Sequence, residues 1–238
     1  MISLLFRFFR YGGFAPGIRN HTSVPVPRIL NEGQKVRALT QIAIFLHAIG
    51  IIGIGAFNST FFSNLTPMHM LIVLSFFVVC AWDQRFIFLK WAGLTYLLSF
   101  SAEWVGVRTG LIFGNYHYEH GLGVQFLKVP LLIGLTWVTV ICGAVSLARR
   151  FTSNFWTTNI LTSAFAILYD WCIEHVAIKL HYWEWQGGAT PLWNYACWGM
   201  LAFLFSVSWQ KFNLKPNKFG MNFFLVQLVF FLVLRILL

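Results

Sequence analysis

The hydrophobic residues of this chain fall into seven long runs that short polar segments separate. A helix needs about 20 mostly apolar residues to cross a bilayer, and the runs reach or approach that length. The second run reaches it only when the preceding Phe61–Phe62 is included. The pattern therefore predicts seven membrane-spanning helices: Ala38–Phe57, Met68–Trp82, Phe86–Ala102, Val129–Ala148, Trp156–Val176, Leu192–Trp209 and Met221–Leu238.

The composition agrees with a membrane protein. Of the 238 residues, 58% are hydrophobic and only 10% are charged, whereas roughly a quarter of the residues of a soluble domain are charged. The scarcity of charge excludes a soluble globule, and disordered chains or disulfide scaffolds need a polar or cysteine-dense sequence. The predicted fold class is all-α: a polytopic helical membrane protein with about seven transmembrane helices.

The basic residues predict the orientation of these helices. With the N-terminus in the cytoplasm, thirteen of the 17 Lys and Arg residues lie on the cytoplasmic side, as the positive-inside rule requires. The formal net charge of +10 then reflects the membrane topology. The expected partner of these basic residues is the layer of anionic lipid head groups at the cytoplasmic face, and not nucleic acid. We therefore expect a multi-pass protein of the cell (plasma) membrane.

The N-terminal segment differs from the rest of the chain. Residues 1–37 are basic and contain proline and glycine, which favours a cytoplasmic arm on the membrane surface over an organellar transit peptide. Residues 38–238 are expected to form a single seven-helix transmembrane domain. The four cysteines fall inside the predicted spans at no metal-like spacing, so we interpret them as small core residues.

The seven carboxylates are distributed unevenly in this topology. Glu32 and Asp83 fall on the cytoplasmic side, and the other five fall in the outer half of the membrane or in outer loops: Glu103, Glu119, Asp170, Glu174 and Glu184. Ionisable groups inside a membrane are costly and usually mark a functional site.

Asp170 and Glu174 stand four residues apart, so they share one helix face. In a low dielectric the two cannot both ionise cheaply, and one is expected to hold a proton near neutral pH. Glu103 joins them if the third and fifth spans pack together. The alternative is that these acids only fasten helices by pairing with basic side chains: Arg108, Lys179, His175 or His181.

Two outer segments have an unusual composition. Gly106–Gly123, GVRTGLIFGNYHYEHGLG, is dense in glycine and aromatic residues, which predicts a tight re-entrant loop. Lys179–Trp198, KLHYWEWQGGATPLWNYACW, is rich in tryptophan, which is typical of a membrane interface. An aromatic pocket beside protonated carboxylates would suit a long hydrocarbon that reacts through a cation, because ring faces stabilise positive charge.

The sequence lacks the motifs that several kinds of catalysis require. Only His117-x-x-His120 approaches a metal-ligand spacing, which is too little for a di-iron centre, and the chain has no HExxH, CxxC pair or phosphate loop. It also has no GxSxG elbow, and its last span has no lysine for retinal. We therefore expect acid chemistry without a cofactor or a bound metal.

Two stretches resemble a known family. The pattern E-x-x-G-x-x-T-G-x-x-F-G-x-Y-x-Y begins at Glu103 and is followed by Val129-Pro130 and Trp137. The second stretch is YDWCIEHVAIKLHYWEW, Tyr169–Trp185, followed by Pro191, Asn194, Tyr195 and Trp198. In order, spacing and setting, roughly residues 38–210 are similar to the carotenoid-biosynthesis membrane proteins typified by carotenoid 1,2-hydratases and bisanhydrobacterioruberin hydratase.

The resemblance implies a cofactor-independent carbon–oxygen lyase that hydrates the terminal C1=C2 double bond of an acyclic carotenoid, lycopene-like or derived from lycopene. A carboxylic acid would protonate C2, and water would capture the tertiary cation at C1. The expected catalytic residues are Asp170, Glu174 and Glu103. The expected substrate-binding residues are Tyr116, Tyr118, His175, Trp183, Trp185, Asn194 and Trp198. Other carotenoid enzymes are further expected partners.

The chain departs from the family pattern at two places. His175 stands where proline commonly follows the glutamate, and Glu119-His120 stand where glycine usually follows the tyrosine. Three other functions stay open: a carotenoid or terpenoid end-group cyclase or isomerase, a proton-coupled transporter that uses the same acids, and a structural or assembly factor. A hydratase differs from a cyclase in product mass, because only hydration adds a water.

Overall fold

The computed structural model describes residues 30–57 and 59–238, and from Asn31 onward they form one compact unit. The unit is mostly helical, as predicted. Its long helices are α2 (Glu32–Ile52), α4 (Thr66–Cys80), α5 (Arg85–Thr109), α6 (Leu132–Ala148), α7 (Phe155–Lys179), α8 (Leu192–Lys211) and α9 (Lys218–Leu237). Shorter turns are the π-helical Gly53–Phe57, α3 (Ser59–Ser63) and the 3-10 turns Trp82–Gln84 and His120–Leu122.

Four helical stretches of the described chain are long and apolar enough to cross a membrane: Glu32–Phe57, Ser59–Cys80, Phe155–Lys179 and Lys218–Leu237. Helix α6 is apolar but shorter. Large hydrophobic side chains are exposed on several helices, among them Phe45, Leu97 and Leu204. Apolar surface on this scale is typical of a protein that contacts lipid.

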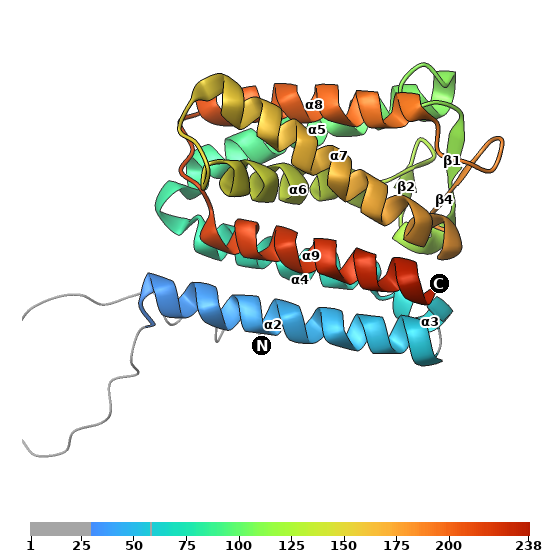
Figure 1. Ribbon diagram of the computed structural model, residues 1–238, viewed down its shortest axis with the longest axis horizontal. Helices are drawn as coiled ribbons and strands as arrows, with labels where there is room; N and C mark the ends of the chain where they lie inside the picture. The colour runs from blue at the N-terminus through green and yellow to red at the C-terminus, as the bar shows by residue number, and fades with distance from the viewer. Residues whose placement is uncertain (1–29, 58) are drawn as a thin grey trace, which may run out of the picture. The chain divides into compact units, whose positions relative to one another are not determined.

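Helix α6 lies among the other helices, with α5, α7 and α9 packed against it. Every residue of α6 from Trp137 to Ser146 is buried, as expected for a helix that is apolar all round. Helix α8 packs along α7, and α2 lies against α9 and α4 (Figure 1). The core is therefore built around α6, and α2 lies on one side of the bundle.

Short strands amend the all-α prediction at one end of the bundle (Figure 1). Strand β1 (Tyr116–Tyr118) pairs antiparallel with β4 (Trp183–Trp185), and β2 (Gln125–Phe126) pairs antiparallel with β3 (Val129–Pro130). In the β1–β4 sheet the partners are Tyr116 with Trp185, His117 with Glu184 and Tyr118 with Trp183. Successive side chains of a strand point to opposite faces, so the aromatic residues share one face and the charged pair lies on the other.

Two predicted helix boundaries beside the outer segments are wrong. Helix α6 begins at Leu132 and not at Val129, because Val129–Pro130 form β3. Helix α5 continues past Ala102 to Thr109, where Gly110 ends it with a φ of 68°, so Glu103 lies inside the helix. The predicted re-entrant loop is therefore a helix end followed by a strand.

Close packing explains why position 106 is a glycine. A Cβ at Gly106 would approach the backbone oxygen of Ile112 to 2.9 Å and the hydroxyl of Tyr116 to 3.1 Å. Only glycine lets the chain after α5 fold back this closely on the helix.

The N-terminal boundary also differs from the prediction. Helix α2 begins at Glu32, capped by the Asn31 side chain, which accepts a hydrogen bond from the backbone N–H of Gln34 at 2.8 Å. The last residues of the expected arm 1–37 are therefore helical. Residues 1–29, on which the rest of that prediction falls, lie outside the described residues.

Candidate active site

A cavity of about 220 Å³ lies among the helices and reaches the inner face of the β1–β4 sheet. Its walls are mostly apolar and aromatic. Three carboxylates line it, namely Glu103 on α5 and Asp170 and Glu174 on α7, and all three side chains are buried. Helices α5 and α7 thus bring together the three acids that the sequence singled out.

Glu103 is held by three neutral donors. Its Oε2 accepts hydrogen bonds from the hydroxyls of Tyr116 at 2.6 Å and Tyr118 at 2.8 Å. Its Oε1 accepts one from the indole N–H of Trp137 on α6 at 2.9 Å. Burial and the adjacent Glu103 charge raise the pKa of Tyr116 and Tyr118 well above the usual value, so both phenols stay protonated and donate.

Glu174 is held in the same way from β4 and the loop after it. Its Oε2 accepts hydrogen bonds from the indole N–H groups of Trp185 at 2.8 Å and Trp183 at 3.3 Å. The hydroxyl of Thr190 donates to the same oxygen at 2.7 Å. The inner face of the β1–β4 sheet, Tyr116, Tyr118, Trp183 and Trp185, therefore donates to two of the three carboxylates.

Asp170 has a sparser environment. Its Oδ2 accepts one hydrogen bond, from the side-chain amide of Asn194 on α8 at 2.5 Å. Within residues 30–57 and 59–238, no hydrogen bond reaches Asp170 Oδ1 or Glu174 Oε1. These two residues line the cavity one helical turn apart, and each keeps an oxygen that a ligand can engage.

None of the three carboxylates is paired with a basic side chain in the part of the chain that the structure describes. The ion pairs there join His117 to Glu119 and to Glu184, outside the cavity. Arg235 instead donates to the backbone oxygen of Trp171 at 3.0 Å. The alternative that these acids fasten the helices by pairing with Arg108, Lys179, His175 or His181 is therefore wrong for the described residues.

Residues 65–238 match the model of a family described as carotenoid biosynthesis protein. The chain belongs to this family. The match covers more than half of the chain and includes all three cavity carboxylates. A search of curated proteins and a search of solved structures found no match.

Most of the site residues expected of this carotenoid biosynthesis protein line the cavity: Glu103, Tyr116, Tyr118, Asp170, Glu174, Trp183, Trp185, Asn194 and Trp198. His175 does not line it. The residue after Glu174 is turned about 100° around the helix, and His175 is half-buried, near Arg235 and Lys179.

Other polar residues of the cavity were not expected as site residues. Trp137 stacks on Trp198, with ring centroids 3.9 Å apart, besides donating to Glu103. Farther along the cavity, His47 on α2 contacts His69 on α4, with ring centroids 4.7 Å apart. Each histidine is the single histidine of an apolar run, and the sequence spacing gives no indication that the two rings meet. For Trp137, the resemblance to the family was the sequence feature that could have indicated a place in the site.

Proposed function

We propose that this protein hydrates the terminal C1=C2 double bond of an acyclic carotenoid end group. The observation that carries the proposal is the set of three buried carboxylates in one apolar cavity, each held by neutral donors and, among the described residues, none paired with a basic side chain. Membership of the carotenoid biosynthesis family supplies the substrate class.

The number of hydrogen bonds to each acid supports a division of roles. Asp170 accepts one hydrogen bond and is assigned as the general acid, whose proton goes to C2. Glu174 accepts three on one oxygen, which stabilise its ionised form more than the single hydrogen bond stabilises that of Asp170, and its free Oε1 takes a proton from water as that water attacks the C1 cation. The product has gained one hydrogen at C2 and one hydroxyl at C1, which balances as one water.

Glu103 has a different role in this proposal. Both of its oxygens accept hydrogen bonds from protein side chains, so it has less capacity to engage a ligand than the two acids of α7. We assign it as a positioning residue that holds Tyr116, Tyr118 and Trp137 at the cavity wall. Aromatic faces there would stabilise the tertiary cation as it forms.

The proposed membrane arrangement has seven spans, with the N-terminus in the cytoplasm. Helices α5, α6 and α8 add three spans to the four stretches that qualify by length and apolar character, because they pack alongside those stretches. The excess of basic residues on one side supports the orientation and a multi-pass protein of the plasma membrane. The cavity acids and the β1–β4 sheet then lie toward the outer face.

Expression in a lycopene-producing host tests the chemistry. Membranes with the wild-type chain should yield pigments heavier by one water for each modified end. The variants Asp170→Asn and Glu174→Gln should lose this product, and the matched control Asp83→Asn, at an exposed turn, should keep it.

Products of unchanged mass but altered absorbance would contradict hydration and favour the cyclase or isomerase alternative. Full product from both cavity variants would contradict the assigned roles. A wild-type chain that leaves lycopene and its acyclic derivatives unchanged would contradict the proposal itself.

A further inference from the structure

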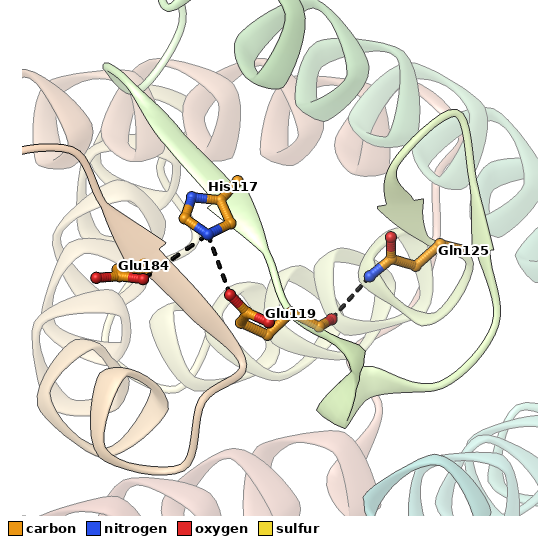
Figure 2. Close-up of polar contacts among 4 residues, drawn as sticks. All are labelled: His117, Glu119, Gln125 and Glu184. Carbon is orange, nitrogen blue, oxygen red and sulfur yellow. Dashed lines mark hydrogen bonds and ion pairs between the residues drawn. The ribbon is translucent and has the colours of Figure 1, made fainter.

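The outer face of the β1–β4 sheet brings together a second group of titratable side chains, separate from the cavity. His117 and Glu184 are direct partners across the two strands, and Glu119 follows two residues after His117. Figure 2 shows the Glu119 and Glu184 carboxylates converging on the His117 ring. The inner face presents the Tyr and Trp donors, so one short sheet has two chemically different faces.

The spacing of these side chains suits a metal ion. His117 Nε2 lies 3.1 Å from Glu119 Oε1 and 3.7 Å from Glu184 Oε2, and one ligand atom from each residue lies within 4.8 Å of the others. Nitrogen and oxygen ligands arranged tetrahedrally at about 2.0–2.2 Å from zinc are about 3.4 Å apart. The two distances from His117 fall on either side of that value, and the two glutamate oxygens, which lie within 4.8 Å of each other, would move closer together to share an ion.

An ion pair alone explains the cluster poorly. The side chains of His117, Glu119 and Glu184 are 59%, 38% and 67% exposed, and ion pairs this exposed contribute little to stability. Over the described ranges neither glutamate forms an ion pair with lysine or arginine, so two carboxylates converge on one imidazole. A divalent cation would balance the two negative charges.

The backbone holds the three positions in place before any ligand arrives. Pairing of β1 with β4 fixes His117 opposite Glu184. The Glu119 N–H donates to the backbone oxygen of Tyr182 at 3.0 Å, and the Gln125 side chain donates to the Glu119 backbone oxygen at 2.7 Å (Figure 2). Because the backbone positions are already fixed, only the side chains have to be ordered when an ion binds.

We infer that His117, Glu119 and Glu184 bind one divalent transition-metal ion of the zinc class, which clamps β1 to β4. The imidazole favours zinc over calcium and magnesium, which prefer sets of oxygen ligands. The half-exposed side chains leave the remaining coordination positions to water. The ion would touch no cavity residue, and it would stabilise the sheet whose other face orients Glu103 and Glu174.

Calorimetric titration of the purified, tag-free chain in detergent, stripped with a chelator, tests this site. Zinc chloride should bind at one ion per chain and more tightly than calcium or magnesium chloride. Glu184→Gln and His117→Ala should each weaken zinc binding at least about tenfold, because each removes a ligand. His120→Ala is the matched control, since this exposed histidine in the same loop is not in the cluster and should leave binding unchanged.

Thermal unfolding gives a second readout. Zinc should raise the Tm of the wild-type chain and of His120→Ala, but not that of Glu184→Gln or His117→Ala, because a ligand of the folded state stabilises it. Absence of one-to-one zinc binding by the wild-type chain would overturn the inference, as would equal binding of calcium. Wild-type affinity in both ligand variants would also overturn it. No carotenoid enters either measurement, so the outcome is independent of the proposed hydration.

Discussion

The two faces of the β1–β4 sheet differ in what they contact, although the same two strands form both. The inner face places Tyr116, Tyr118, Trp183 and Trp185 against buried carboxylates, and the outer face exposes His117 and Glu184. Strand alternation alone produces this separation. Neutral donors therefore hold the acids inside the bundle, whereas the ion pairs of His117 with Glu119 and Glu184 lie where water reaches them.

Among substitutions in the cavity, Asp170→Asn is expected to have the largest effect on hydration activity. Asp170→Asn keeps an oxygen for the Asn194 donor but removes the transferable proton, so hydration should fall by about 100-fold or more. The Tm should stay close to that of the wild type. Product yield and thermal unfolding of the same detergent preparation check both parts. Activity within a few-fold of the wild type would remove Asp170 as the acid.

Glu103→Gln should act mainly on stability. The glutamine amide replaces one acceptor oxygen with a donor, so one of Tyr116, Tyr118 and Trp137 loses its acceptor in the interior. An unsatisfied buried donor costs about 1–3 kcal/mol, which should appear as a lower Tm than that of Asp170→Asn. The reverse order of the two melting temperatures would contradict the roles assigned to these acids.

Trp185→Phe removes one donor to Glu174 and keeps a smaller aromatic ring at this position. Hydrogen bonds to charged groups contribute about 1.5–3 kcal/mol, so activity should fall by about tenfold or more. Trp193→Phe is the matched control, because the Trp193 indole donates to the backbone oxygen of Leu111 and does not line the cavity. Equal losses from the two substitutions in a pigment assay would mean that the indole contact with Glu174 has no special role.

The smallest effect is expected at the edge of the outer face. His120→Ala removes an exposed side chain in the loop after β1 and should change the free energy of unfolding by less than about 0.5 kcal/mol. Urea unfolding followed by tryptophan fluorescence measures the change. A larger loss would extend the outer cluster beyond His117, Glu119 and Glu184.

The sequence predicted the helices well because the requirement of about 20 apolar residues leaves a clear pattern. Each predicted run overlaps one long helix, and the errors lie at boundaries, such as β3 at Val129–Pro130, where proline and strand pairing displace the start of α6. The sharing of a cavity by Asp170 and Glu174 followed from helical periodicity. Local rules are sufficient for these features.

The contacts across the chain were not predictable in the same way. The hydrogen bonds from Trp183 and Trp185 to Glu174 depend on the register of β4 with β1, and this pairing joins segments that are far apart in the sequence. His175 was expected at the pocket because it follows Glu174, but a helix turns neighbouring residues to different faces. Pairing of His117 with Glu184 has the same non-local origin, which the spacing His117-x-x-His120 does not reveal.

The source of the oxygen in the product tests the central claim most directly. Membranes containing the wild-type chain would be incubated with an acyclic carotenoid in water labelled with heavy oxygen, and the pigments would be weighed. Hydration through Asp170 and Glu174 predicts a hydroxylated product that carries the heavy isotope, and no such product from Asp170→Asn. A hydroxyl without the isotope, or labelled product at wild-type yield from Asp170→Asn, would contradict the account.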